Sequence, residues 1–378
     1  MLVLDHRKDI SPPADGQLLR YLDITTLIDS LELDVERDYI VFDEQIPPKQ
    51  LLELLDKKQP KYCALNLSII HPLHNDYIKY IAKKYKNTFF IFFYNETYYY
   101  NTIVNDDLNN FVCISNGIQK YRQVDDDRYF NYYILNTLIQ RQYNKFLHYI
   151  FKSTLDLKRQ KKYLFYNGVH KPHRLKVYDL ILKHKLLDDG FYSYLDVANI
   201  GTHRKQEFLD FFDVSEQQYD EYIKKFKIPY LCDSTEVTQN IFFPFVNPPQ
   251  YAFQSYVNIT TETTFFDDKD WVSTSEKSFK SFLSFNIPLT FGQRKLNRYL
   301  KDLGFDLFDD LFDTSDTHTH DEMYNQIDTN LKVIKDIKPI DLHNFYIENR
   351  HRIEKNFITV TTIAKQSIET IRNKCLEF

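Results

Sequence analysis

Short apolar runs alternate with amphipathic segments along the first half of the chain. Apolar runs of four to eight residues predict strands, and apolar residues every three or four positions predict helices. The predicted strands are 39–42, 62–70, 88–94 and 110–115, and the predicted helices are 48–57, 75–86 and 130–152. The segment 88–94 is almost continuously apolar, which is typical of a strand buried on both faces. Repeated alternation of strand and helix predicts a largely parallel sheet with right-handed crossovers.

A basic, polar segment at 158–162 interrupts this pattern, and a second α/β series follows it. The predicted strands of this series are 163–166, 190–194, 256–260 and 287–291. Helices are predicted at about 173–184, 205–211, 215–225, 276–286, 294–303, 320–338, 341–356 and 359–377. We therefore expect two Rossmann-like parallel-sheet domains, 1–157 and 158–340, and helices in 341–378 that cross back over both domains.

Composition limits the class of protein. The 378 residues are 43% hydrophobic and 27% charged, as in ordinary globular proteins, and the net charge of −5 gives no general attraction to nucleic acid. The four cysteines lie far apart, which favours a reducing compartment and argues against a zinc knuckle.

No apolar run approaches the roughly 20 residues of a membrane span. We expect a cytoplasmic protein, in the host cytoplasm if the chain is viral. Only seven glycines occur, so each is expected to mark a tight backbone position.

The first segment with candidate chemistry follows the strand at 163–166. Asn167 and Gly168 are expected to turn the chain, and Pro172 suits the first turn of a helix. Four basic side chains cluster at the predicted start of this helix: His170, Lys171, His173 and Arg174. Cations there oppose the helix dipole, so a bound anion such as a diphosphate would explain them. A solvated basic patch is the alternative.

The second segment runs from the strand at 256–260 to the strand at 287–291. Between them, Ser273, Thr274 and Ser275 precede Glu276 and Lys277 at a predicted helix start. Glu276 fits a capping box, in which it would only stabilise the helix end. The functional alternative is that Glu276 accepts hydrogen bonds from ribose hydroxyls while Lys277 reaches phosphate. In open α/β folds, ligands bind outside the carboxyl ends of strands, where both segments are expected to lie.

Together, these two segments resemble the donor half of the α1,3-fucosyltransferases. The first likeness is the strand ending in Tyr166–Asn167–Gly168, the Arg174 that opens the next helix, and the turn 188–190. The second is Thr274–Ser275–Glu276–Lys277 with 287–292, which is similar to the family's T-E-K-(helix)-x-P-V-x-x-G signature. The chain also resembles uncharacterised phage and giant-virus glycosyltransferase-like proteins, which share 300–308. The likeness covers about 163–310, with Ser275 inserted before Glu276 and Asn286 in place of the family's glycine.

This resemblance implies a GT-B-like fold whose two Rossmann-like domains face a cleft. It implies a glycosyltransferase that moves a sugar from a GDP or UDP donor to an acceptor hydroxyl, with inversion and without a metal or other cofactor. The domain 158–340 would bind the nucleotide sugar and the domain 1–157 a glycan acceptor. Arg174 and Lys277 would bind the diphosphate, assisted by His173, and Glu276 would bind the ribose. Asn167 and Gly168 would line the donor turn.

An inverting transfer also needs a base that takes the proton of the acceptor hydroxyl. Glu96 directly follows the apolar strand at 88–94, and His71 follows the strand at 62–70, so both are candidates.

Glycosylation of hydroxymethylated bases in viral DNA is a second hypothesis. The basic residues that could form a DNA-binding groove are Lys57, Lys58, Lys83, Lys84 and Arg141. A non-catalytic nucleotide- or glycan-binding protein is the third. Neither a P-loop nor a G-x-G-x-x-G fingerprint occurs.

Overall fold

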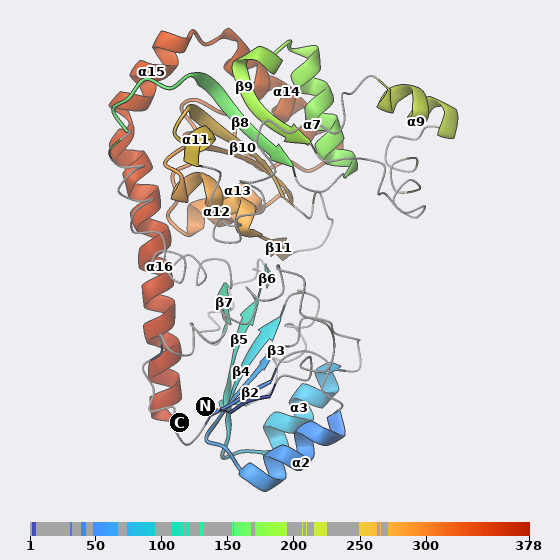
Figure 1. The fold of residues 1–378 in the computed structure, drawn as a ribbon, viewed down its shortest axis with the longest axis vertical. Helices are drawn as coiled ribbons and strands as arrows, with labels where there is room; N and C mark the ends of the chain where they lie inside the picture. The colour runs from blue at the N-terminus through green and yellow to red at the C-terminus, as the bar shows by residue number, and fades with distance from the viewer. Residues whose placement is uncertain are drawn as a thin grey trace. The chain divides into compact units, whose positions relative to one another are not determined.

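A computed structural model describes most of the C-terminal part of the chain and the core elements of the N-terminal part (Figure 1). The described residues are 2–4, 31, 39–42, 48–66, 74–94, 108–115, 118–120, 129–131, 153, 155–167, 171–194, 206, 209, 215–224, 249–262, 265 and 271–378. They form two compact units. Unit 1 comprises 1–144, 269–275 and 360–378, and unit 2 comprises 145–268 and 276–359.

Unit 1 is built on a parallel sheet with the strand order β1-β2-β3-β4-β5-β7. Its strands are β1 (Leu2–Leu4), β2 (Tyr39–Phe42), β3 (Tyr62–Asn66), β4 (Phe89–Tyr94), β5 (Phe111–Ser115) and β7 (Tyr129–Asn131). Its helices are α2 (Pro48–Lys58) and α3 (His74–Lys84). A separate antiparallel pair joins β6 (Ile118–Lys120) to β11 (Trp271–Ser273).

Strand β4 shows why unit 1 needs so apolar a central segment. Phe90 and Phe92 belong to the core on the side of Leu55 and Ile81, which come from α2 and α3. Phe89 lies in the core on the other face of the sheet. Both faces of β4 are thus covered, as its nearly continuous apolar sequence predicts.

Unit 2 contains a second parallel sheet, with the strand order β12-β10-β8-β9. Its strands are β8 (Lys161–Asn167), β9 (Gly190–Tyr194), β10 (Ser255–Thr261) and β12 (Ile287–Phe291). Its helices are α7 (Pro172–Lys183), α9 (Glu216–Ile223), α11 (Pro249–Ala252), α12 (Glu276–Leu283), α13 (Leu296–Asp302), α14 (His320–Asp336) and α15 (Pro339–Glu348), with a 3₁₀ turn, η2, at Leu187–Asp189. In Figure 1, α7 and α14 lie together on one side of this sheet, and α12 and α13 lie on the other. The predicted α/β class with two parallel sheets and C-terminal helices is confirmed.

The last helix, α16 (Arg350–Glu377), contributes to the cores of both units. Its first half supplies Ile353 and Phe357 to the core of unit 2. Its second half supplies Ile371 and Cys375 to the core of unit 1, where the Cys375 carbonyl accepts a hydrogen bond from the Tyr62 hydroxyl at 3.0 Å.

Two predicted helix boundaries were wrong. The helix expected over 130–152 cannot begin at Phe130, because this residue lies in β7, paired in parallel with β5; the residues from 132 to 152 lie outside the described part. The break expected between 356 and 359 lies instead at Asn349, between α15 and α16. Phe357 and Val360 are buried, so core packing keeps α16 continuous across the predicted break.

A buried arginine holds the amino edge of the unit 2 sheet together. Arg159, 4% exposed, donates from Nη1 to the carbonyls of Ala252 at 2.8 Å and Ser255 at 2.5 Å. It also donates to the Tyr346 hydroxyl, over whose ring its guanidinium carbon lies at 4.4 Å from the centroid. Asn286 donates to the same two carbonyls at 2.8 and 2.7 Å. Asn286, which stands where the fucosyltransferase pattern has glycine, therefore has a structural role at the amino edge of this sheet.

An ion-pair network fixes the segment after α13 to α16. Arg352 donates to both carboxylate oxygens of Asp306, at 2.7 and 2.8 Å, and to both of Asp310, at 2.8 and 2.9 Å. Burial is the largest single influence on the pKa of Asp306 and raises it, but the hydrogen bonds from Arg352 and the Phe308 N–H and the charges of Arg352 and Lys355 together outweigh burial, so this pKa lies below its ordinary value. Hydrogen bonds from Arg352 likewise lower the pKa of Asp310. The motif at 300–308 thus contributes a carboxylate to the packing of the last helix.

Arg352→Ala should lower the free energy of unfolding by about 2 kcal/mol at neutral pH, because charge-assisted bidentate pairs are lost. Both carboxyl pKa values are lowered in the folded state. Their stabilising contribution is therefore present above the ordinary carboxyl pKa, about 4, and is lost as the pH falls through the lowered folded values. The difference between wild type and variant should be constant above about pH 5 and should shrink as the pH falls further. Urea unfolding at a series of pH values measures it.

Arg350→Ala is the matched control, since Arg350 makes a single ion pair with Asp156 in which the side chains are 54% and 70% exposed. Such a pair contributes about 0.5 kcal/mol or less. Equal losses in the two variants would contradict a special role for the Arg352 network.

Candidate functional site

Three strands of the unit 2 sheet end side by side at its carboxyl edge. Strand β8 ends at Asn167, β10 at Thr261 and β12 at Phe291. The Thr261 hydroxyl donates to Oδ1 of Asn167 at 2.8 Å, which ties the ends of β8 and β10 together. Asn167 is 2% exposed, and no described residue lies within hydrogen-bonding distance of its Nδ2. Asn167 is therefore the last residue of β8, with a buried amide nitrogen that has no partner among the described residues; the turn predicted after it lies outside the described part.

Glu262, the residue after β10, connects this edge to the start of α12. Its Oε1 accepts hydrogen bonds from the backbone N–H of Ser278, at 3.0 Å, and from the Ser278 hydroxyl. Glu262 is 1% exposed, so its carboxylate is buried against the first turn of the helix. A carboxylate is favoured there because the first N–H groups of a helix lack intrahelical partners. Capping of α12 thus involves a residue distant in the sequence.

His173 lies at the start of α7 and contacts the same loop. It is 6% exposed, and its Nε2 donates to the Glu262 carbonyl at 3.0 Å. Its ring stacks on Phe265 with centroids 4.5 Å apart and the planes 1° from parallel. Burial, reinforced by the charges of Arg174 and Lys171, lowers the pKa of His173 well below its ordinary value. At neutral pH His173 is therefore an uncharged hydrogen-bond donor, which differs from the cationic side chain that the sequence predicted.

Of the other predicted donor residues, the structure describes Arg174 and Lys277 with their side chains. Arg174, in the first turn of α7, is 1% exposed, so its charge acts from inside the protein. Lys277, in the first turn of α12, is half-buried, and its backbone carbonyl accepts from the Thr260 hydroxyl at 3.5 Å. Glu276 is the first residue of α12, although its side chain lies outside the described part. Gly168 also lies outside it. Unit 2 thus brings the end of β8, the start of α7 and the first turn of α12 to one edge, where Thr261 and Glu262 connect them by hydrogen bonds.

The two candidate bases, Glu96 and His71, lie outside the described residues. Strand β4 ends at Tyr94, two positions before Glu96. Their role as general base stays a prediction.

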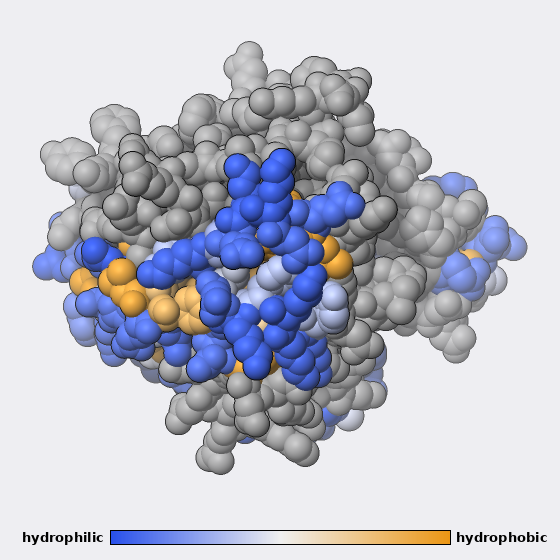
Figure 2. Space-filling model, turned by 90° about the horizontal axis from the view of Figure 1, so that it is seen from below, coloured by the Kyte–Doolittle hydropathy of each residue, from blue (hydrophilic) through white to orange (hydrophobic). Residues whose placement is uncertain are grey.

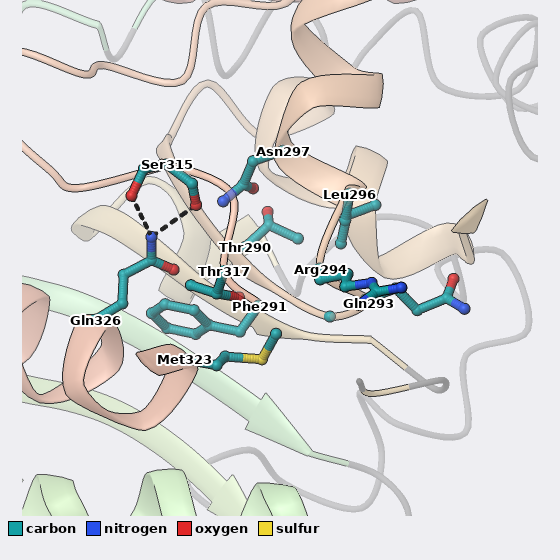
Figure 3. Close-up of a pocket in the computed structure, with 11 residues that line it drawn as sticks. Thr290, Phe291, Gln293, Arg294, Leu296, Asn297, Ser315, Thr317, Met323 and Gln326 are labelled. Atoms are coloured by element: carbon teal, nitrogen blue, oxygen red, sulfur yellow. Dashed lines mark hydrogen bonds between the residues drawn. The ribbon is translucent and has the colours of Figure 1, made fainter. Parts of the chain in front are cut away.

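A small cavity lies at the same edge, beside the end of β12 (Figure 3). Gly292 follows β12 and packs closely: a Cβ there would lie 2.6 Å from Cδ2 of Leu296 and 3.0 Å from Cβ of Glu262. The cavity is bounded by this turn, by the start of α13 and by α14. Neither this cavity nor Glu262 was predicted. Glu262 could have been found, because it directly follows a buried strand, which is the criterion that selected Glu96.

The lysines proposed for a DNA groove lie at the amino edge of the unit 1 sheet. Lys57 and Lys58 end α2, and Lys83 and Lys84 end α3. Since these helices run back from the carboxyl edge, their last turns lie at the amino edge, where lysines complement the helix dipole. Lys84 is paired with Asp56 at 3.1 Å; Arg141 lies outside the described part. Figure 2 views the end at which α2 lies, and the described residues on that face are mainly hydrophilic.

The described residues also bear on metal binding and on membrane insertion. Within the described residues, no group of three or more His, Cys, Asp or Glu side chains is arranged to hold a metal ion. Among the described helices, none is both long and apolar enough to span a membrane.

Comparison with known proteins gives a remote structural likeness. No known protein family and no curated protein sequence matches this chain. Among solved structures, the chain is similar to an α,α-trehalose-phosphate synthase (UDP-forming) from Burkholderia vietnamiensis. The TM-score is 0.41 at 10% identity, over 97% of this chain and 82% of that chain. A likeness of this degree carries no information about activity, so residue roles have to come from the geometry of this chain.

Proposed function

We propose that this protein is a glycosyltransferase whose unit 2 binds the nucleoside diphosphate of a sugar donor at the carboxyl edge of its sheet. One observation carries the proposal. The end of β8, the start of α7 and the first turn of α12, the last about 100 residues further along the chain, are connected at this edge through the Thr261–Asn167, His173–Glu262 and Glu262–Ser278 hydrogen bonds. Ligands of parallel α/β sheets bind at this edge, where helix N-termini favour anions.

In this proposal Lys277 contacts the diphosphate and neutralises charge as it develops on the leaving group. Arg174 is buried, so we propose that its positive charge attracts the diphosphate from a distance and that its side chain does not contact the diphosphate directly. Glu276 binds the ribose, and Asn167 and Gly168 form the turn beneath the phosphates. The acceptor is a glycan hydroxyl, the reaction is inverting and metal-independent, and unit 1 supplies the base from Glu96 or His71.

A second candidate is a nucleotide-binding protein without catalysis. This candidate is favoured by the burial of His173 and Arg174. Of these three predicted donor-site residues, Lys277 is the one whose side chain is half-buried rather than buried. It predicts nucleotide binding without release of sugar. The DNA acceptor is less favoured, because the described lysines of the predicted groove end helices at the amino edge of their sheet.

Thermal unfolding with UDP, GDP, CDP and ADP, followed by assays of nucleotide release from the corresponding sugars, tests the proposal. A ligand that binds the folded state raises the melting temperature. We expect UDP or GDP to raise it and the matching sugar nucleotide to be turned over when an acceptor is present. Stabilisation without turnover against a broad acceptor panel would favour the second candidate. No response to any nucleotide would overturn both.

A further inference from the structure

Glu262 hydrogen-bonds to β12, α7 and α12 through its N–H, its carbonyl and its carboxylate. The N–H donates to the Phe291 carbonyl at 2.8 Å, which extends the pairing of β10 with β12 by one residue. The carbonyl accepts from Nε2 of His173 at the start of α7, and the carboxylate accepts from Ser278 of α12. Helices α7 and α12 lie on opposite sides of the sheet (Figure 1), so Glu262 joins the two helix starts at the sheet edge.

The first turn of α12 is held to the end of β10 at neighbouring positions. The Thr260 hydroxyl donates weakly to the Lys277 carbonyl at 3.5 Å, and Oε1 of Glu262 accepts from the Ser278 N–H at 3.0 Å and from the Ser278 hydroxyl. Thr260 and Glu262 are separated by one residue, so an extended chain directs both side chains to the same face of the sheet. Successive helical residues lie roughly 100° apart around the axis, so fixing Ser278 also fixes the direction in which the Lys277 side chain leaves the helix.

The Glu262 side chain itself has little freedom to move. It is 1% exposed. Gly292 packs against its stem, because a Cβ at Gly292 would lie 3.0 Å from Cβ and 3.3 Å from Cγ of Glu262. The glycine therefore leaves the space that the Glu262 stem fills. A carboxylate held in this way fixes the first turn of α12 relative to the end of β10.

The Glu262 carboxylate also limits how α12 can bind an anion. A phosphate at a helix start would ordinarily accept from the N–H groups of the first turn. The Ser278 N–H is already bonded to Glu262, so in the proposed donor site the contact from α12 comes from the Lys277 side chain. The position of that ammonium group depends on the position of the turn, and a misplacement of about 1 Å can cost roughly 100-fold in rate.

We propose that Glu262 is a positioning residue for sugar transfer, because its bonds to Ser278 hold the first turn of α12 so that Lys277 meets the leaving diphosphate. This inference rests on the proposed function. Glu262 acts through Lys277 and does not itself contact the substrate. The Glu262–Ser278 bonds should therefore matter for turnover only while Lys277 is present.

Initial rates of nucleotide release, with the sugar nucleotide and acceptor that wild type turns over, test the inference. Ser278→Ala removes the hydroxyl that bonds to Oε1 and keeps the backbone N–H. Glu262→Asp keeps the charge and shortens the side chain by one CH₂ group. We expect kcat to fall roughly two- to tenfold in Ser278→Ala, as loss of one hydrogen bond does, and roughly tenfold or more in Glu262→Asp. The KM for the sugar nucleotide should change less than about twofold, because Lys277 acts on charge that develops in the transition state.

The same substitutions in a Lys277→Ala background separate positioning from stabilisation of the fold. Without Lys277, each should change kcat by less than about twofold, since the effects of residues that act through one another are not additive. A role in folding alone would lower kcat by the same factor in both backgrounds. Melting temperatures check that each variant is folded at the assay temperature, and Ser278→Ala alone carries the test if Glu262→Asp does not fold.

Ser281→Ala is the matched control, because Ser281 is another fully buried serine of α12 whose hydroxyl has no partner among the described residues. It should leave kcat unchanged. Unchanged kcat in every folded variant at Ser278 and Glu262, or equal factors with and without Lys277, would overturn this inference and leave the proposed function standing. A wild type that turns over no sugar nucleotide would overturn the proposed function and, with it, this inference.

Discussion

Gly190→Ala is expected to lower the free energy of unfolding of unit 2 by about 3 kcal/mol or more, the upper range for overpacking a buried site. Gly190 begins β9 and is paired with Tyr163 of β8. A Cβ at this position would lie 2.1 to 2.4 Å from three carbons of the Tyr163 ring. That ring is completely buried, and its hydroxyl donates to the Leu186 carbonyl at 3.2 Å, so it has no room to move aside. Chemical unfolding monitored for unit 2 measures the loss.

Gly292→Ala provides the comparison for this variant. Its nearest obstacle is the end of the Leu296 side chain at 2.6 Å, which can rotate away, whereas the obstacle at Gly190 is a fixed aromatic ring. We expect Gly292→Ala to cost about 1 kcal/mol. A Gly190→Ala variant as stable as Gly292→Ala would show that the Tyr163 ring yields more easily than its packing implies.

Lys277→Ala is expected to reduce the rate of sugar transfer on the order of 100-fold, the scale on which loss of one group that stabilises developing charge acts. Lys277 lies in the first turn of α12, at the helix end where the Glu262 carboxylate is already bound. Its ammonium group is the predicted contact to the leaving diphosphate. Because Lys277 is half-buried and outside the core clusters, the melting temperature should change little. Initial rates with the preferred sugar nucleotide, compared with the melting temperature, measure the effect.

Lys280→Ala is the matched control, since Lys280 lies in the last turn of the same helix. It should retain most of the activity. Lys277→Arg should recover part of it, because the positive charge is kept while the geometry of the donor group changes. Full turnover of Lys277→Ala would remove Lys277 from the proposed mechanism.

The strands and the edge of the sheet that carries the site could be predicted from sequence because they depend on local signals. The apolar runs that become β8, β10 and β12 have strand length, and the turn residues Asn167 and Gly292 stand where the strands end. The rarity of glycine was a useful signal, since Gly190 and Gly292 both lie where a Cβ would clash.

Other features depend on contacts between residues far apart in the chain. The buried state of His173 follows from stacking on Phe265 and bonding to Glu262, and no local pattern shows that its pKa falls. The cap of α12 comes from Glu262, 16 residues before Ser278. Helix α16 continues through the predicted break because both units bury parts of it. Burial and pairing of this kind are set by the tertiary fold, which overrides local propensity.

Asn286 illustrates how structure changes the meaning of a sequence difference. By resemblance, it is a departure at a position where glycine is expected, close to the donor-site signature. Its amide donates to the carbonyls of Ala252 and Ser255, which also accept from Arg159, at the amino edge of the sheet. The difference therefore concerns how α11 and β10 are joined, and it does not affect the carboxyl edge where we place the donor.

Hydrogen–deuterium exchange of the full chain with and without UDP or GDP tests most directly where the nucleotide binds. We expect slower exchange in peptides that contain 167–175 and 276–279, at the two helix starts, and in peptides around 290–297, at the end of β12 on the same edge. Exchange in α2 and α3 should not change. Protection confined to unit 1, or saturating nucleotide without protection at either helix start, would contradict a donor site at the carboxyl edge of the unit 2 sheet.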